Sequence, residues 1–325
     1  MIFIFLLTLI IGFAVLLKGA DVFVDGSCGM ARIFNVPGLV IGLTLVSMGT
    51  SAPELAISTV AAIQGSNEIA LSNVIGSNIF NLLIVLGICS IIKPLPVAAV
   101  ALKRDYPILL ISTVMVFVIA VVFQGAYGSI GDIFVSEEVG IVSRKLGMLL
   151  LGVFVIYLII LFVTARGEEE DVPQKDDYTI KKCIIMIVAG LIMIITGGQA
   201  VVYGARNIAA AMGLSETLIG LTVVAFGTSL PELMTSIVAA GKGETGLAVG
   251  NVLGSNIFNM LFILGISSSV HPIIVNGESA VDLVILIVIS VIAYIFSFSK
   301  KKIGRFEGIC MVFIYVADLI YVIRR

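Results

Sequence analysis

Long apolar runs alternate with short polar stretches along the whole chain. Most runs have the ~20 residues that a helix needs to cross a bilayer, and the weak ~10-residue alternation of a membrane β-barrel is absent. The pattern therefore predicts an all-α integral membrane protein with about ten transmembrane helices. The predicted helices cover residues 2–24, 36–63, 68–91, 106–123, 146–165, 183–203, 214–240, 245–270, 280–298 and 306–323.

Composition supports this class and excludes others. The chain has 325 residues, of which 59% are hydrophobic and 12% are charged, whereas a soluble domain has about 25% charged residues. The net charge is −2, and no basic tract suited to nucleic acid is present. The four cysteines are scattered through apolar sequence and form no CxxC pair. We therefore expect small buried side chains at these positions rather than a redox or metal centre.

The distribution of positive charge predicts how the chain lies in the membrane. Ten helices place successive loops on alternate sides, and 14 of the 19 Lys and Arg residues then fall on the side of the loop 166–182. Positive residues stay cytoplasmic. We therefore predict that this loop is cytoplasmic and that both termini lie outside the cell membrane. The loop is strongly acidic, and we expect a solvated linker there, with a regulatory cation site as the alternative.

The second half of the chain repeats the first at an offset of 178 residues. The segment 42–54 ends in GTSAPE, and its equivalent 220–232 ends in GTSLPE. The sequence GSNIFN at 76–81 recurs unchanged at 254–259. The alignment needs no gap from residue 40 to residue 88, so chance identity is not a credible explanation.

This repeat divides the chain into two domains of five helices. The first domain is 1–165 and the second is 183–325, with the linker 166–182 between them. Because five is odd, the second repeat enters the membrane from the opposite side. Inverted repeats of this kind occur in many secondary transporters, which bind substrate near the midplane between the repeats.

The first motif places a carboxylate and a helix breaker at membrane depth. Pro53 has no N–H and its ring clashes with the carbonyl four residues earlier, so the helix should break within residues 49–52 and free carbonyls near Ser47. Bare backbone at this depth is tolerated only where it lines a cavity, and an ionisable group there is usually functional. Glu54 is therefore a candidate site residue, and Glu232 is its equivalent in the second repeat.

The other polar groups of the motifs also offer oxygen. Ser47, Ser51 and Glu54 share one helical face. Ser77 and Asn81 share a face of the next helix. Hard cations such as Ca²⁺ bind six to eight oxygens from carboxylates, amides, carbonyls and water. Two carboxylates neutralise one Ca²⁺ or two Na⁺, and without a cation they would repel until one took a proton. The residue set indicates a site at which cations compete.

Each part of the motifs also has a purely structural interpretation. A proline kink in a membrane helix is often only a kink, and Ser or Thr hydroxyls often bond their own backbone. Asn78 and Asn256 could bond across helices instead of binding an ion, and the motif glycines could serve close helix packing. The two glutamates differ, because they are ionisable and stand at equivalent positions of both repeats.

These motifs carry a resemblance. GTSAPE and GTSLPE, each followed by GSNIFN, resemble the two alpha-repeats of the sodium/calcium exchanger family in the cation/calcium antiporter superfamily. The resemblance implies long first and sixth helices that slide against the other eight. It also implies central Ca²⁺ ligation with flanking Na⁺ sites. The implied site residues are Glu54, Glu232, Thr50, Thr228, Ser51, Ser229, Ser77, Ser255, Asn81, Asn259, Ser47 and Ala225, the last two through their backbone carbonyls.

We therefore expect an electrogenic Na⁺/Ca²⁺ antiporter that acts as a monomer, with no enzymatic activity and no cofactor. Potassium-dependent relatives tend to carry Asp where this chain has Asn259, which argues against K⁺ cotransport. The proton/calcium branch usually has a different first motif, which favours Na⁺. An H⁺/Ca²⁺ antiporter, in which Glu54 and Glu232 take the protons, is the alternative. An intramembrane hydrolase and a passive channel are more distant alternatives.

Overall fold

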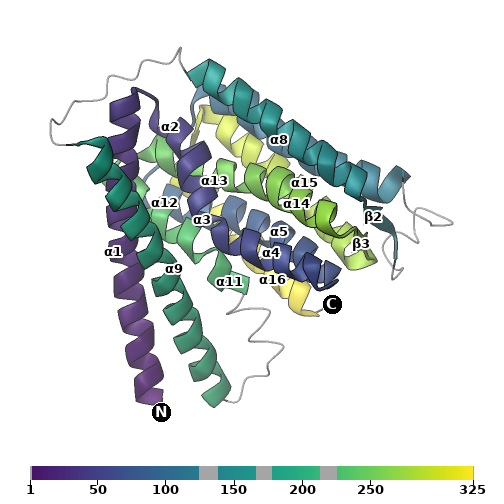
Figure 1. Cartoon of the computed structure of the whole chain (residues 1–325), viewed down its shortest axis with the longest axis horizontal. Coiled ribbons are helices and arrows are strands. Elements are labelled where there is room, and N and C mark those ends of the chain that lie inside the picture. Colours follow the sequence, from purple (N-terminus) through teal and green to yellow (C-terminus); the bar gives the residue numbers. More distant parts are fainter. Residues whose placement is uncertain (1, 124–137, 166–177, 213–224, 325) are drawn as a thin grey trace.

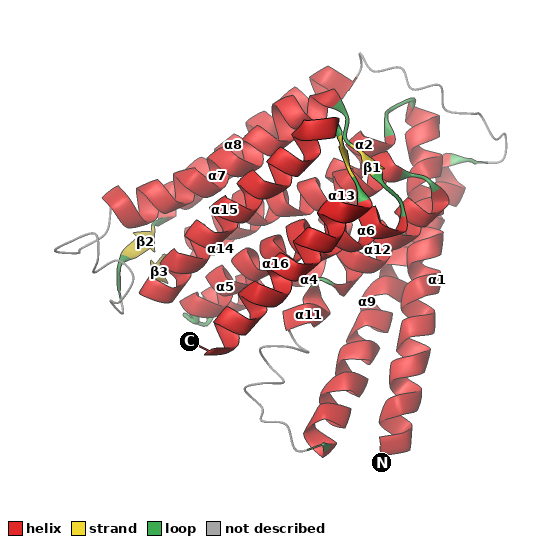
Figure 2. Ribbon diagram, turned by 180° about the vertical axis from the view of Figure 1, so that it is seen from behind, coloured by secondary structure: helices red, strands yellow, loops and turns green. Residues whose placement is uncertain are grey.

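The computed structural model describes residues 2–123, 138–165, 178–212 and 225–324, and nearly all of this part is helical (Figures 1 and 2). The helices are α1 (Ile2–Phe34), α2 (Gly38–Ile41), α3 (Ser47–Thr50), α4 (Ala52–Ile63), α5 (Asn67–Phe80), α6 (Leu86–Ile92), α7 (Tyr106–Phe117), α8 (Arg144–Ala165), α9 (Ile180–Ala211), α11 (Ala225–Thr228), α12 (Leu230–Lys242), α13 (Thr245–Ile257), α14 (Leu264–Val270), α15 (Gly277–Lys300) and α16 (Arg305–Arg324). Wider π-helical turns occupy Gly42–Val46, Asn81–Val85, Ala101–Asp105, Val118–Phe123 and Phe258–Ile263. The strands are β1 (Leu95–Pro96), β2 (Gly140–Val142), β3 (Ile273–Val275) and β4 (Lys302–Ile303).

The apolar pattern predicted the membrane spans well. Among the described residues, eight helices are long and apolar enough to cross a membrane, and the pair Gly38–Thr50 and Ala52–Ile63, bent by 50°, is a ninth candidate. The predicted helix 68–91 corresponds to the observed span Ile69–Ile92. The predicted helix 214–240 lies partly outside the described residues. The fold class, an all-α membrane protein, is confirmed.

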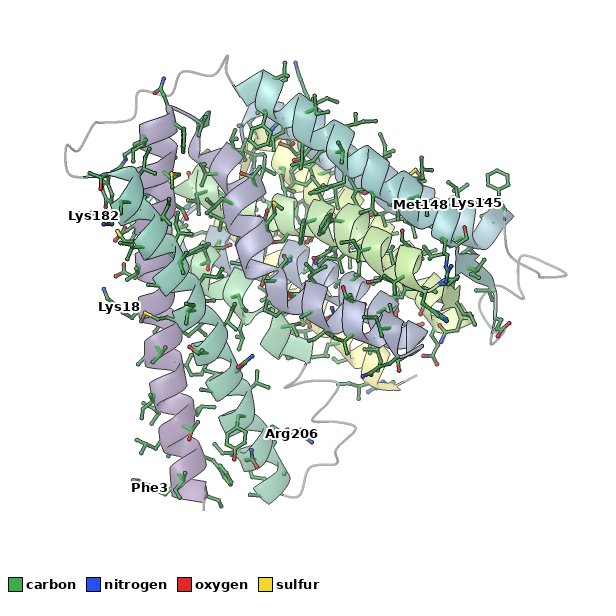
Figure 3. The ribbon with its side chains drawn as sticks, viewed as in Figure 1. Phe3, Lys18, Lys145, Met148, Lys182 and Arg206 are labelled. Atoms are coloured by element: carbon green, nitrogen blue, oxygen red, sulfur yellow. The ribbon has the colours of Figure 1, made fainter. Side chains whose placement is uncertain are left out.

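The first and sixth helices are the two longest, as the resemblance implied. α1 has 33 residues and α9 has 32, so each spans about 50 Å, compared with ~30 Å of bilayer hydrocarbon. They lie side by side and antiparallel, and their ends near Phe3 and Arg206 extend beyond the other helices (Figures 1 and 3). The predicted ranges 2–24 and 183–203 were too short because they stopped at bilayer length, although no proline interrupts either helix.

Glycines allow α1 and α9 to approach closely. A Cβ added at Gly197 would lie 2.6 Å from the backbone nitrogen of Leu16, and one at Gly190 would lie 2.7 Å from that of Phe23. Neither distance leaves room for a side chain. The contact between the two helices is therefore one of small residues that bring backbones together, as is common in membranes.

Two short antiparallel sheets, which the sequence did not predict, join loops of the two halves. β1 pairs with β4, with Leu95 opposite Ile303, and β2 pairs with β3, with Gly140 opposite Val275. α15 runs from β3 to β4, so the sheets lie at opposite ends of the helix bundle (Figure 2). We call these ends the β1–β4 face and the β2–β3 face. Strands of two or three residues are too short to produce a recognisable alternation.

The two spans that carry GSNIFN form the centre of the bundle. The most apolar 18-residue window of Thr245–Val270 is 94% buried within the protein, and that of Ile69–Ile92 is 72% buried. The same measure is only 11–39% for the other long spans. Their exposed apolar side chains, such as Phe3 and Met148, point outward (Figure 3). The motif helices are therefore enclosed by a shell of helices suited to contact lipid.

The fourth span begins earlier than predicted. It covers Ala101–Phe123 instead of 106–123 and takes in a completely buried carboxylate, Asp105. Arg104 Nε donates to Asp105 at 2.7 Å, and the Tyr157 hydroxyl donates to it at 3.1 Å. A buried charge needs such partners, and they were not visible from the apolar pattern.

Candidate functional site

Both proline motifs interrupt their helices where the sequence predicted a break. Ser51, between α3 and α4, has φ −82° and ψ 10°, and Ser229, between α11 and α12, has φ −92° and ψ 5°. Pro53 and Pro231 stand in the first turn of the following helix, where a missing N–H leaves no bond unmade. After each break, the glutamate in the first turn of the next helix is completely buried.

The two motif glutamates are completely buried and are bonded by serines of the opposite repeat. Ser51 Oγ donates to Glu232 Oε1 at 2.8 Å. Ser229 Oγ donates to Glu54 Oε1 at 3.4 Å, and Ser77 Oγ donates to the same oxygen at 3.4 Å. The structure therefore brings the motifs of the two halves together at one place. Two carboxylates buried together repel each other unless positive charge stands between them.

The asparagines of the GSNIFN motifs divide into two kinds. Asn78 Nδ2 donates to the Asn256 carbonyl at 3.2 Å, and Asn256 Nδ2 donates to the Asn78 carbonyl at 3.2 Å. These amides bond across the helices, in agreement with their structural interpretation. Asn81 and Asn259 lie in π-helical turns, a distortion often found at functional sites. Asn259 Nδ2 donates to Asn78 Oδ1 at 3.0 Å, and this leaves the side-chain oxygen Asn259 Oδ1 for other partners.

Several buried oxygens of the predicted site lack a hydrogen-bond partner within the described part of the chain. They are Glu54 Oε2, Glu232 Oε2, Asn81 Oδ1, Asn259 Oδ1 and Ser255 Oγ. A stranded buried polar group costs about 1–3 kcal/mol, so together they would cost an amount comparable to the ~5–15 kcal/mol stability of a whole domain. Oxygens of these kinds are ligands of hard cations such as Na⁺ and Ca²⁺. The amide nitrogen Asn81 Nδ2 also lacks a partner among the described residues.

Cysteine and histidine do not contribute to this site. The described residues contain no group of three or more His, Cys, Asp or Glu side chains arranged to hold a metal ion. A cation bound by the two carboxylates would therefore need hydroxyl and amide oxygens to complete its coordination shell. Such a shell suits a cation that is bound and released as substrate, because its hydroxyls and amides are weak ligands.

The remaining predicted residues flank the breaks. Thr50 is buried and lies within hydrogen-bond distance of the Ser47 carbonyl (3.3 Å) and of Asn251 Oδ1 (3.2 Å). The Ser47 carbonyl also accepts the Ser51 N–H at 3.0 Å, so the break does not free it as predicted. Ala225 begins α11 and Thr228 ends it, so both precede the second break. Their part in ion binding remains a prediction.

Sequence reasoning missed two asparagines that support the glutamates. Asn73 Nδ2 donates to the Glu54 carbonyl at 3.3 Å and to Ser58 Oγ at 2.9 Å. Its equivalent Asn251 makes the same two bonds in the second repeat, to the Glu232 carbonyl at 3.3 Å and to a serine hydroxyl at 2.9 Å. The signal was available, because these residues also recur at the offset of 178, within the ungapped alignment.

The fold is that of an all-α membrane protein with buried carboxylate, hydroxyl and amide oxygens at its centre, and comparison with known proteins identifies the family. The family model described as sodium/calcium exchanger protein matches residues 4–163 and 182–324. This chain therefore belongs to the sodium/calcium exchanger family, whose members are cation/Ca²⁺ antiporters and not enzymes.

Two relatives and one solved structure match over most of their length. The putative antiporter CaxA of Alkalimonas amylolytica is 36% identical over 83% of this chain and 82% of its own. The sodium/calcium exchanger MaX1 of Methanosarcina acetivorans is 33% identical over 97% of both chains. The sodium-calcium exchanger NCX_Mj, in a structure soaked with zero Na⁺ and Ca²⁺, superposes with a TM-score of 0.82 at 32% identity, covering 99% of this chain and 100% of that one.

Proposed function

We propose that this chain exchanges Na⁺ for Ca²⁺ by alternating access at the site formed by Glu54 and Glu232. The observation that carries the proposal is the set of unpartnered buried oxygens around the two carboxylates. One Ca²⁺ or two Na⁺ would neutralise two ionised carboxylates, so the ions compete for the same charge. A site that is stable only when neutralised favours exchange over release of one ion without replacement.

Sodium is the coupling ion that we favour. MaX1, which matches nearly the whole chain, is named a sodium/calcium exchanger. Asn81 and Asn259 are both amides, which keeps the formal charge of the site at −2. An H⁺/Ca²⁺ antiporter remains the second candidate, because the same two buried carboxylates could carry protons instead of Na⁺.

The proposed orientation places the β1–β4 face in the cytoplasm. This face carries Lys93 and Lys300 near the ends of β1 and β4, together with the C-terminal end of α8 and the N-terminal end of α9 (Figures 1 and 2). The β2–β3 face, with the N-terminal end of α1 and the C-terminal end of α16 on its side, would lie outside (Figure 2). The excess of Lys and Arg assigned to the first face supports this orientation. We also propose that the monomer is the functional unit and that no cofactor is required.

Transport in proteoliposomes tests the proposal. Vesicles that contain the purified protein are given an outward Na⁺ gradient at fixed pH, and ⁴⁵Ca²⁺ uptake is measured. We expect Na⁺-dependent uptake. Uptake that follows a pH gradient and ignores Na⁺ would instead establish the H⁺/Ca²⁺ alternative.

The two glutamates are tested in the same vesicles. Glu54→Gln and Glu232→Gln should each reduce uptake about 100-fold or more, since a charged group's contact with the ion contributes about 3 kcal/mol. Glu138→Gln, at an exposed position on the β2–β3 face, is the matched control and should retain wild-type uptake. Full activity in either Glu54→Gln or Glu232→Gln would refute the site assignment.

A further inference from the structure

The last asparagine of each GSNIFN motif has the same neighbours in sequence but different hydrogen bonds. Asn259 Nδ2 donates to Asn78 Oδ1 at 3.0 Å. The repeat relates these two residues to Asn81 and Asn256, and the equivalent bond is missing: Asn81 Nδ2 and Asn256 Oδ1 both lack a partner within the described part of the chain. Since the two motifs are identical, tertiary structure and not local sequence decides this difference.

The first asparagines of the two motifs lie on the axis that relates the repeats. Asn78 Nδ2 donates to the Asn256 carbonyl, and Asn256 Nδ2 donates to the Asn78 carbonyl, both at 3.2 Å. Equivalent residues that bond each other reciprocally mark a two-fold axis. The bond from Asn259 to Asn78 therefore breaks the symmetry of the site immediately beside this axis.

The backbone carbonyl of Asn256 fixes the orientation of the amides that follow it. A carbonyl oxygen only accepts hydrogen bonds, so the Asn78 atom that faces it must be the amide nitrogen. Asn78 Oδ1 then faces Asn259 as an acceptor, and the Asn259 atom 3.0 Å away must be the nitrogen. Asn259 Oδ1 is consequently held on the other side of its amide, buried and without a partner among the residues that the structure describes.

The turns that carry Asn81 and Asn259 lie against the helices that carry the two glutamates. The π-helical turn with Asn259 packs against α4, whose first turn contains Glu54. The turn with Asn81 packs against α12, whose first turn contains Glu232. An amide oxygen that is already oriented beside a carboxylate can bind a cation directly, whereas an amide without such a bond first has to lose rotational freedom.

We propose that Asn78 is a positioning residue of the cation site, which orients Asn259 as a ligand, and that Asn256 has no such role for Asn81. The inference rests on the proposed function, because it assumes that Asn259 Oδ1 binds the transported cation. It adds a residue that touches no ion and acts only through the amide that it holds. Two motifs of identical sequence then supply one ligand that is fixed before the ion arrives and one that the ion itself has to order.

Asn78→Ala and Asn256→Ala are a matched pair of variants that tests this role. Each removes one 3.2 Å bond across the helices, and only Asn78→Ala also releases Asn259. Equilibrium binding of ⁴⁵Ca²⁺ to the purified proteins is measured in detergent without Na⁺, at a temperature where both are folded. Asn78→Ala should raise half-saturating Ca²⁺ about fivefold, as expected for the loss of one neutral hydrogen bond, and Asn256→Ala less than about twofold. Equal shifts in the two variants would overturn the proposal.

A double-mutant cycle shows whether Asn78 acts through Asn259. Asn259→Ala removes the ligand and should weaken Ca²⁺ binding at least as much as Asn78→Ala does. In the Asn259→Ala background, Asn78→Ala should have no further effect on half-saturating Ca²⁺, because no amide is left to orient. Additive effects would show that Asn78 acts by general destabilisation, and the proposal would be wrong. If Asn78→Ala does not fold, Asn78→Thr, which keeps a similar side-chain volume, takes its place, with Asn256→Thr as the control.

The same measurements separate failure of this inference from failure of the proposed function. If Asn259→Ala weakens Ca²⁺ binding and Asn78→Ala does not, Asn78 is not a positioning residue, while the exchange function stands. If Asn259→Ala leaves Ca²⁺ binding unchanged, Asn259 is not a ligand and the inference falls with that part of the site. If Asn78→Ala weakens binding as expected but Na⁺ drives no uptake into vesicles with the wild type, the positioning role stands and the coupling ion is wrong.

Discussion

Asn251 and its equivalent Asn73 offer a test of how the two glutamates are supported. Both donate to a glutamate carbonyl and to a serine hydroxyl, but Asn251 is completely buried and Asn73 is only partly buried. Asn251 is completely buried and joins three groups: the Glu232 carbonyl at 3.3 Å, Ser236 Oγ at 2.9 Å and Thr50 Oγ1 at 3.2 Å. Replacement by Ala removes all three bonds at once. It leaves the Ser236 hydroxyl without this donor where water does not reach, while the Glu232 carbonyl keeps only the backbone bond of its own helix.

The expected size of the effect follows from these contacts. The stranded hydroxyl costs about 1–3 kcal/mol and each of the two other lost bonds about 0.5–1.5 kcal/mol, so Asn251→Ala should destabilise the protein by roughly 3–5 kcal/mol. Asn73 is only partly buried and lines a cavity, so water can replace its two bonds, and we expect about 1–2 kcal/mol for Asn73→Ala. At roughly 2 °C per kcal/mol for a chain of this size, Tm should fall by about 6–10 °C and about 2–4 °C.

The assay is thermal unfolding of both variants in one detergent, with ⁴⁵Ca²⁺ uptake measured at a temperature where both are folded. Asn207→Ala is the matched control, since Asn207 is partly exposed and its side chain donates to a carbonyl of its own helix, that of Tyr203, at 2.8 Å. Its Tm should change by no more than about 1 °C. Equal falls in Tm for Asn251→Ala and Asn73→Ala would refute the reasoning, because they would show that water does not replace the lost bonds at position 73 any better than at position 251.

Three further predictions concern the helix contact and the ions. Gly197→Ala should lower stability by about 1–3 kcal/mol through the clash with α1, whereas Gly198→Ala, with no described atom within 4 Å, should be neutral or raise it, as thermal unfolding would show. Ser51→Ala removes a 2.8 Å bond to a carboxylate and should raise half-saturating Ca²⁺ about tenfold, while Ser229→Ala, which removes a 3.4 Å bond, should raise it less. Asn259→Asp adds a third carboxylate, and we expect K⁺ to stimulate Ca²⁺ uptake in this variant and not in wild type; no K⁺ effect in either would remove the argument from position 259.

Much of the fold could be predicted because the bilayer imposes a simple rule. Apolar runs had to be long enough to cross it, which located spans such as Ile69–Ile92 to within one residue. The same rule failed for α1, because a helix that continues past the membrane carries no signal at the membrane boundary. Asp105 was left outside its helix because two adjacent charges, Arg104 and Asp105, mark a polar boundary in the sequence, whereas the Tyr157 bond to the buried carboxylate is a tertiary contact.

The residues that make up the site could be predicted, but the hydrogen bonds between the two repeats could not. Proline chemistry located the break that includes Ser51, and the repeat identified Glu232 as the partner of Glu54. The sequence contained nothing to indicate that Ser51 bonds the glutamate of the other repeat, since that depends on how the two halves cross. The π-helical turns at Asn81 and Asn259 were equally invisible, because no residue type specifies them.

The two small sheets have a consequence for the origin of the chain. β3 starts at Ile273, which is 178 residues after Leu95 at the start of β1, so β1 and β3 are copies of one strand. β1 pairs with a strand late in the second half, and β3 pairs with a strand late in the first. The two sheets are therefore one contact made twice, as in a dimer with two-fold symmetry. A single five-helix ancestor, inserted into the membrane in both directions, would make both sheets with a second copy of itself, and gene duplication and fusion would preserve them inside one chain.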